Sequence, residues 1–206
     1  MHPCGLRETK KAATRRSLAR AVLRLASVDG IERVTIDAVA AEAGVSVRTF
    51  HNYFSGKEDA LLYYVSSLLD SVADAIDARP DGESLWDSMR IAMTEIACTS
   101  ETAEPSEFVT MFRLLDTEPT LVAHSNRIDL VGTATDRLER SFRRRGEDPT
   151  KLYPHLACGA AISAVRTALD FWARRDTTIE LREVLDAAFA QAGSGLAQPL
   201  RQTEEL

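Results

Sequence analysis

The residues best suited to chemical recognition lie in one short stretch, TIDAVAAEAGVSVRTFHNYFSGK, which runs from residue 35 to residue 57. Its second half carries two side chains that can read base pairs, because Arg48 can donate twice to guanine and Asn52 can pair with adenine. Hydroxyl groups and a lysine near the expected helix ends suit phosphate oxygens. The candidate DNA-binding residues are Thr35, Ser46, Val47, Arg48, Thr49, His51, Asn52, Tyr53 and Lys57.

The spacing within this stretch predicts a helix-turn-helix. Thr35 is a good N-cap for a short helix that ends at Gly44, and Ser46 can cap the second helix. Ala40 falls where the two helices cross, so a larger side chain would push them apart. Gly44 falls at the sharp turn, where a positive φ is expected. The inward-facing residues that should form a small core are Val39, Ala43, Val45 and Phe50.

Charge separates this region from the rest of the chain. Residues 1–57 contain ten Lys and Arg against five Asp and Glu, a net charge of +5, and the remainder carries −11. The total of −6 therefore hides a basic N-terminal region on an acidic body. A basic surface of this kind favours a polyanionic partner.

The stretch, together with its flanks over about residues 8–65, resembles the TetR family of bacterial transcriptional repressors. The resemblance implies an all-helical C-terminal domain that forms a dimer and binds a small molecule. Two positions depart from the family pattern. His51 stands where an aromatic residue that touches the DNA backbone is usual, and Asp37 lies near the expected phosphates, where some members carry a basic residue. The matching residues are Thr35, Ile36, Ala40, Ala43, Gly44, Val45, Ser46, Thr49, Phe50, Tyr53, Phe54, Lys57, Glu58 and Leu61.

The whole chain predicts an all-α fold of about nine helices. Alanine is abundant, no segment shows convincing period-two alternation, and glycine or proline interrupts the pattern at long intervals. The first helix should bury Leu18, Val22, Leu25 and Ala26. The expected helices cover residues 8–28, 35–44, 47–54, 55–78, 84–99, 105–115, 119–145, 149–175 and 179–192.

Three segments are expected along the chain. Residues 1–56 would form a three-helix DNA-binding domain, residues 57–195 a larger helical domain for effector binding and dimerisation, and residues 196–206 a polar tail. For the dimer, small residues over 156–169 would let another helix approach closely, and a four-helix bundle would result. The alternative is that this face packs inside its own subunit. The partners on the last helix would be Val184, Leu185, Ala188 and Phe189.

Large apolar side chains on the middle helices are candidates for an effector pocket. Methionines and aromatic residues line adaptable apolar cavities, although such a stripe at helical spacing is also typical of plain core. They suggest a small hydrophobic effector, either an acyl chain or a flat drug-like molecule. The candidates are Trp86, Met89, Met93, Phe108, Met111, Phe112, Leu115, Phe171 and Trp172.

Motifs of other functional classes are missing from the sequence. It contains no HExxH, P-loop, GxSxG or paired Glu-x-x-His, so we expect no enzyme, cofactor or metal. Cys4, Cys98 and Cys158 are expected to be free thiols, and no spanning segment or signal is expected. Asp70, Asp74 and Asp77 are interpreted as a solvated face. Arg143, Arg144 and Arg145 are interpreted as favourable charges at a helix C-terminus.

These observations together predict a cytoplasmic, nucleoid-associated regulator of transcription. It would be a homodimeric repressor that binds a palindromic operator, since two recognition helices about 34 Å apart read two half-sites. A small hydrophobic effector would release it. Two alternatives stay open: a ligand-dependent activator, and a basic helical protein that binds another polyanion, either RNA or an anionic membrane surface.

Overall fold

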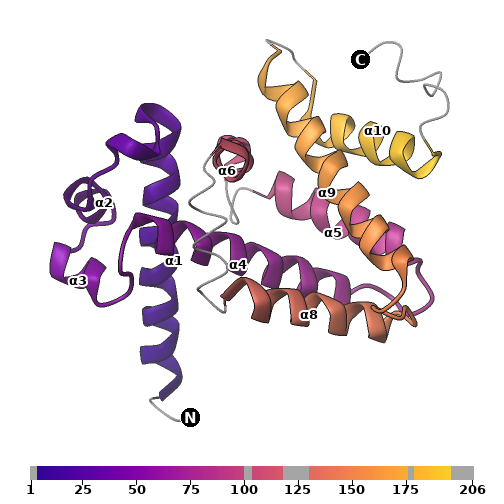
Figure 1. Ribbon diagram of the computed structural model, residues 1–206, viewed down its shortest axis with the longest axis horizontal. Helices are drawn as coiled ribbons and strands as arrows, with labels where there is room; N and C mark the ends of the chain where they lie inside the picture. The colour runs from indigo at the N-terminus through magenta and orange to yellow at the C-terminus, as the bar shows by residue number, and fades with distance from the viewer. Residues whose placement is uncertain (1–3, 100–103, 118–129, 176–178, 196–206) are drawn as a thin grey trace. The chain divides into compact units, whose positions relative to one another are not determined.

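The computed structural model of the chain describes residues 4–99, 104–117, 130–175 and 179–195 (Figure 1). Within these ranges it contains nine α-helices, one 3-10 helix and no β-strand, which confirms the all-α prediction. Contacts divide the chain into two compact units. The N-terminal unit contains the described residues up to 68, 110–117 and 130–133, and the C-terminal unit contains those from 69 to 109 and from 134 onward.

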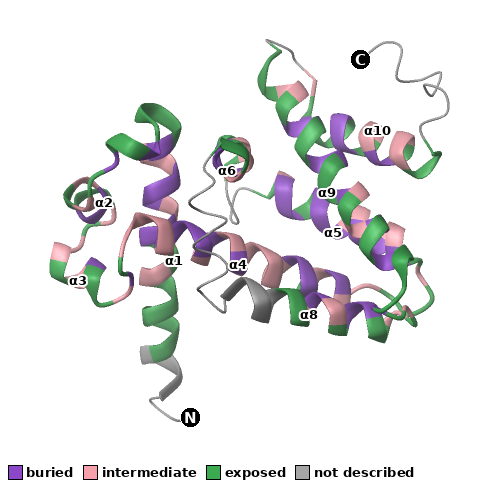
Figure 2. Ribbon diagram, in the orientation of Figure 1, coloured by how far each residue is buried: buried purple, intermediate pink, exposed green. Residues whose placement is uncertain are grey.

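The N-terminal unit contains the expected helix-turn-helix. Its elements are α1 (Cys4–Asp29), the 3-10 helix η1 (Ile31–Arg33), α2 (Ile36–Glu42), α3 (Val47–His51) and the first half of α4 (Lys57–Asp77). Three of the four residues expected to face the core from the first helix, Leu18, Val22 and Ala26, are buried, and Leu25 is half-buried. Figure 2 shows this burial confined to the C-terminal half of α1.

The C-terminal unit is built on the contacts of α9 (Leu152–Ala173) with α5 (Leu85–Cys98) and α10 (Leu181–Gly193). Its core includes Met89, Leu169 and Phe189, and the Trp86 ring lies against Phe189 with 5.6 Å between centroids. Three of the four residues predicted to form the dimer face of the last helix, Val184, Leu185 and Phe189, are buried inside this unit. For that part of the face the alternative of packing within the subunit is correct, because α9 and α5 already cover it.

Carboxylates on α4 face arginines on α8 (Leu130–Arg144) in the C-terminal unit. Arg137 pairs with Asp70 at 3.2 Å and also with Asp74, and Arg144 pairs with Asp77. The interpretation as a solvated face holds for Asp70 and Asp74, whose side chains are 42% and 64% exposed. The row is in addition an ion-pair face, because two arginines of α8, seven residues or about two turns apart, meet it.

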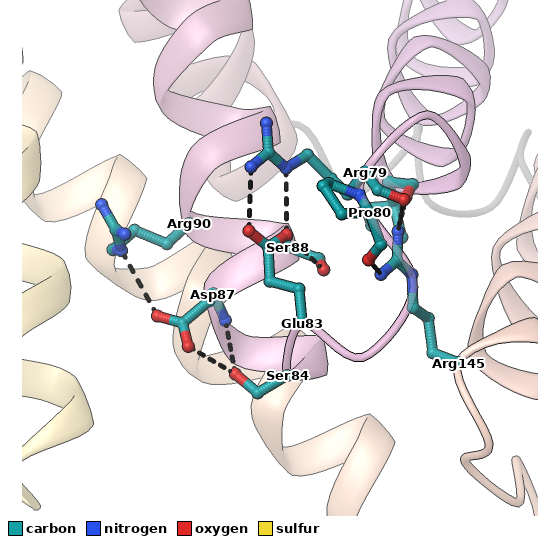
Figure 3. A network of polar contacts seen from close by, with 9 residues as sticks. Arg79, Pro80, Glu83, Ser84, Asp87, Ser88, Arg90 and Arg145 are labelled. Atoms are coloured by element: carbon teal, nitrogen blue, oxygen red, sulfur yellow. Dashed lines mark hydrogen bonds and ion pairs between the residues drawn. The ribbon is translucent and has the colours of Figure 1, made fainter.

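The C-terminal end of α4 is held by Arg145, which follows α8 (Figure 3). Its guanidinium donates to the carbonyl oxygens of Ile76, Arg79 and Pro80 at 2.5, 2.7 and 2.6 Å. Carbonyl groups at a helix end have no partner inside the helix, so this contact satisfies them. Arg145 thus does more than complement a helix dipole, which was its predicted role.

The next turn continues this network into α5. Arg79 donates twice to Glu83, at 2.8 and 2.9 Å, and Ser88 donates to the same carboxylate. The hydrogen bonds from Arg79 hold the pKa of Glu83 at about 2, so the carboxylate stays charged in neutral and mildly acidic solution. Ser84 caps α5 by accepting from the Asp87 amide at 3.1 Å, at the start of the helix predicted over 84–99.

Several helix boundaries differ from the predicted ones. The first helix begins earlier, at Cys4, and α3 ends earlier, at His51. α9 begins at Leu152 because Asp148 accepts hydrogen bonds from the amide and hydroxyl of Thr150 and closes a turn there. α6 (Pro105–Thr117) is slightly longer than expected. The first part of the helix predicted over 119–145, and the tail over 196–206, lie outside the described residues.

We expect Arg145→Ala to lower the free energy of unfolding by about 1–2 kcal/mol, because it removes three hydrogen bonds from a charged donor, although the Ile76 and Pro80 carbonyl oxygens keep a backbone donor. The matched control is Arg143→Ala on the preceding helix, which removes only an exposed pair with Glu139 and should cost less than about 0.5 kcal/mol. Urea unfolding of the two variants measures the difference. Equal losses would mean that Arg145 does not stabilise the end of α4.

Candidate nucleic-acid interface

The turn between α2 and α3 has the predicted caps. The Thr35 hydroxyl accepts from the Ala38 amide at 3.2 Å, and the Ser46 hydroxyl accepts from the Thr49 amide at 3.1 Å. Gly44 has φ of 66°, a conformation that other L-residues rarely adopt. The Val45 amide donates to Ala40 across the turn at 2.9 Å, so backbone contacts also fix the angle between the helices.

The small core beneath the two helices is formed by fewer residues than predicted. Val39, Ala40 and Phe50 are buried, whereas Ala43 and Val45 are only half-buried. The Phe50 ring also contacts Phe54, with 5.8 Å between centroids. The core is therefore completed by the residues that follow α3.

The surface of α3 and its C-terminal turn carries the candidate base-reading side chains. Arg48, His51 and Asn52 are exposed, and the His51 ring meets the Phe50 ring edge-on at 5.6 Å. Val47, Thr49 and Tyr53 are half-buried, while Thr35 and Ser46 are exposed at the two helix starts. The structure thus brings eight of the nine candidate DNA-binding residues to helix starts, to α3 and to the turn after it.

Lys57 is the exception, because its ammonium group is used inside the domain. It donates to the carbonyl oxygens of Ile31, Glu32 and Val34 at 2.7, 3.2 and 3.2 Å. An ammonium group has three N–H donors, and three acceptors are present here. The predicted role as a phosphate clamp is therefore corrected: Lys57 ties the start of α4 to η1.

Two further arginines stabilise this unit, and local sequence reasoning missed both. Arg24 on α1 pairs with Glu42 on α2 at 3.0 Å. The guanidinium carbon of Arg15 lies 4.2 Å from the centroid of the Tyr63 ring and 5.3 Å from that of Phe54, in cation–π geometry. Neither contact produces a short-range spacing signal in the sequence.

The candidate effector residues do not all belong to one unit. Trp86, Met89 and Met93 on α5, Phe108 on α6, and Phe171 and Trp172 on α9 lie in the C-terminal unit. Met111, Phe112 and Leu115, further along α6, lie in the N-terminal unit. Met89, Met93, Phe108 and Met111 are buried, and the other five are half-buried.

A cavity of about 720 Å³ lies in the C-terminal unit, where α5 and α9 end and α10 begins. Of the candidate effector residues, only Trp172 lines it. The Cys98 thiol also lines it, and burial raises the pKa of that thiol. The charged part of its wall consists of Glu180, Arg182, Glu183 and Asp186. Among the residues with described placement, no group of three His, Cys, Asp or Glu could hold a metal ion.

Two capped helices, a glycine turn and an exposed polar face on the second helix define the class of helix-turn-helix DNA-binding proteins. The family model described as bacterial regulatory proteins of the tetR family matches residues 18–63, and the model described as the MftR C-terminal domain matches residues 83–197. The chain belongs to the TetR family of bacterial transcriptional regulators. DNA-binding regulation of transcription follows from that membership.

Relatives agree with this assignment. A Mycobacterium tuberculosis protein whose name describes a mycofactocin biosynthesis transcriptional regulator, MftR, is 24% identical over 91% of this chain and 93% of its own length. The regulator TcmR of Streptomyces glaucescens is 30% identical over 58% of this chain and only 55% of its own length. The crystal structure of Thermus thermophilus FadR in complex with lauroyl-CoA has a TM-score of 0.53 at 23% identity, with 89% and 95% of the chains covered.

We expect Lys57→Met to lower the melting temperature, because it removes three hydrogen bonds from a charged donor and should cost about 1–2 kcal/mol, although the Ile31 carbonyl oxygen keeps the Val34 amide as a donor. The salt dependence of DNA binding should stay unchanged, since removing a group that binds phosphate would reduce its slope by about 0.9. Thermal unfolding and a salt titration of binding to duplex DNA measure both quantities. The matched control is Arg33→Met, an exposed cation on η1. An unchanged melting temperature with a reduced slope would restore the phosphate role of Lys57.

Proposed function

We propose that this chain is a homodimeric repressor that binds a palindromic operator and is released by a small hydrophobic effector. The observation that carries the DNA-binding part is the exposed pair Arg48 and Asn52 on a helix-turn-helix whose turn and caps are fixed by backbone contacts. A rigid scaffold matters because base readout needs side chains in a defined position.

In the proposed complex α3 enters the major groove. Arg48 donates to O6 and N7 of a guanine, and Asn52 pairs with N6 and N7 of an adenine. His51 and Val47 contact base edges or the adjacent backbone. Phosphate oxygens bind near the two helix starts, through the exposed hydroxyls of Thr35 and Ser46, and beside α3, through Thr49 and Tyr53.

The exposed apolar side of α9 supports the proposed homodimer. Leu152 and Leu156 are 77% and 62% exposed, Ile162 is 37% exposed, and Gly159 between them leaves room for a close helix approach. By length and composition alone α9 could also cross a membrane, although a third of its most apolar window is buried in the chain. A second copy of the chain would cover the exposed apolar side of α9 with its own α9, because a two-fold interface pairs the same surface on both subunits.

An acyl chain is the effector class that we favour. Met89, Met93 and Phe108 are soft apolar side chains in the core of the C-terminal unit, which could repack around such a chain, and the structurally similar FadR was solved with lauroyl-CoA. In the proposed mechanism the effector binds one conformation better than the other and thereby shifts the angle of α4. Because α4 starts directly after the helix-turn-helix, its angle would change the spacing of the two recognition helices.

Selection of binding sites from random duplex DNA tests the proposed operator recognition. The wild-type protein should enrich a palindrome, and Arg48→Ala should relax one base pair in each half-site, with a loss of about 1–3 kcal/mol per guanine contact. Arg33→Ala, at an exposed arginine outside α3, is the matched control and should enrich the same palindrome.

The outcomes of this selection separate the alternatives. Enrichment of no sequence, with only salt-sensitive binding, would contradict operator recognition and favour another polyanion. With the operator in hand, lauroyl-CoA should weaken binding if the protein is a repressor. Tighter binding would instead indicate a ligand-dependent activator, and unchanged binding would contradict the acyl effector.

We expect Leu156→Glu to shift the protein from dimer to monomer, because a carboxylate on an apolar two-fold interface is buried without a partner. Light scattering with size-exclusion chromatography measures the mass. Leu156→Ala should weaken the dimer while keeping the fold. The matched control is Val28→Glu, which introduces the same charge at a valine that is 81% exposed at the end of α1. A dimer that persists in Leu156→Glu would rule out α9 as the interface.

A further inference from the structure

Residues 8–13 of α1 add no side chain to the core of the N-terminal unit, whereas Arg15, further along the helix, contacts the rings of Tyr63 and Phe54. The helix begins at Cys4, and among its side chains with described burial, from Glu8 onward, the first buried one is Leu18. Residues 8–13 are all exposed, and in the view of Figure 2 the N-terminal half of α1 extends beyond the other helices of its unit. Isolated helices of this length are marginally stable in water, so the segment gains little from packing within the chain.

Residues 8–14, termed the projecting segment, carry lysines on the side of the helix that further along α1 is apolar and buried. Positions seven and eleven residues apart lie nearly on one side of a helix, so Lys11 continues the face that carries Leu18 and Val22. Lys10 lies beside Lys11, along the row of the buried Ala21. Where a longer core would need apolar residues, the sequence places two exposed lysines. Among the described residues, none pairs with either lysine side chain.

The segment also precedes the part of the chain that the N-terminal family model matches. The matched model for the N-terminal domain starts at residue 18, which is the first buried residue among those of α1 with described burial. Residues 4–17 precede that match and continue the same helix without a break. Lys11 lies about 10 Å along the axis from Leu18, at a rise of about 1.5 Å per residue.

The positive charge of the projecting segment and its fixed position relative to α3 together favour DNA as its partner. α1 is fixed to α2 by the ion pair between Arg24 and Glu42, and α2 is fixed to α3 by the turn at Gly44. The projecting segment is therefore held in a fixed position relative to α3. Phosphates are the groups that exposed lysines bind most readily on DNA.

We propose that residues 8–14 of α1 form a second DNA contact, in which Lys10 and Lys11 bind phosphates outside the base pairs read by α3. This contact rests on the proposed function, since it needs a duplex docked on the helix-turn-helix. It carries no sequence information and adds affinity, a longer footprint and a steeper salt dependence.

The test compares the wild-type protein with the double variant Lys10→Ala/Lys11→Ala on the selected operator, with short flanks and with flanks extended by about ten base pairs. The variant should bind on the order of tenfold more weakly, and its salt slope should fall by about 0.9 for each phosphate that it no longer binds. Only the wild-type protein should gain affinity from the longer flanks. The matched control is Arg143→Ala/Lys151→Ala, which removes the same charge from exposed positions in the C-terminal unit.

The possible results distinguish this inference from the proposed function. An unchanged affinity, slope and flank dependence in the lysine variant, with specific binding retained, would overturn the inference alone. A failure of both proteins to prefer the operator would overturn the proposed function and this contact with it. A variant that keeps its DNA affinity but loses binding to phosphatidylglycerol vesicles would assign the segment to a membrane surface instead. Circular dichroism checks that the helix content of the variant is preserved.

Discussion

Helix α4 depends at each end on a cation that donates to backbone carbonyl groups. At its start Lys57 binds three carbonyls in and beside η1, and beyond its end Arg145 binds the carbonyls of Ile76, Arg79 and Pro80. Removing either cation would leave polar groups unsatisfied, at a cost of about 1–3 kcal/mol for each buried one. α4 begins in the N-terminal unit and ends in the C-terminal unit, so these two side chains set where it begins and ends.

The ion pairs along α4 extend this constraint to the body of the helix. Arg137 bridges Asp70 and Asp74, and Arg144 meets Asp77, so three successive turns of α4 face α8 through charged groups. Single exposed pairs contribute little, but a bridging arginine restricts both carboxylates at once. A ligand that displaces α8 or the turn after α4 would therefore move the C-terminal half of α4 together with it. The proposed mechanism requires this coupling.

The sequence predicted the features that short-range contacts determine. The caps of Thr35 and Ser46 accept from amides three residues ahead, and the turn at Gly44 needs one backbone conformation, so each leaves a local pattern. The role of Lys57 was missed because its acceptors lie 23 to 26 residues away, and those of Arg145 lie 65 to 69 residues away. A helix face predicted for a partner was also buried within the chain, because amphipathic periodicity does not specify what covers a face.

The distribution of the basic residues shows why net charge alone overestimates a DNA-binding surface. The N-terminal region carries ten cations, but Arg15 stacks on aromatic rings, Arg24 pairs with Glu42 and Lys57 binds carbonyl groups. Each of these three side chains stabilises the N-terminal unit, and its cationic group is engaged by a partner within that unit. The side chains that remain exposed, such as Arg48 on α3 and the lysines of α1, are the ones whose charge reaches solvent. A basic helix-turn-helix domain therefore uses one set of cations to fold and another to meet phosphates, and only the second set should set the salt dependence of binding.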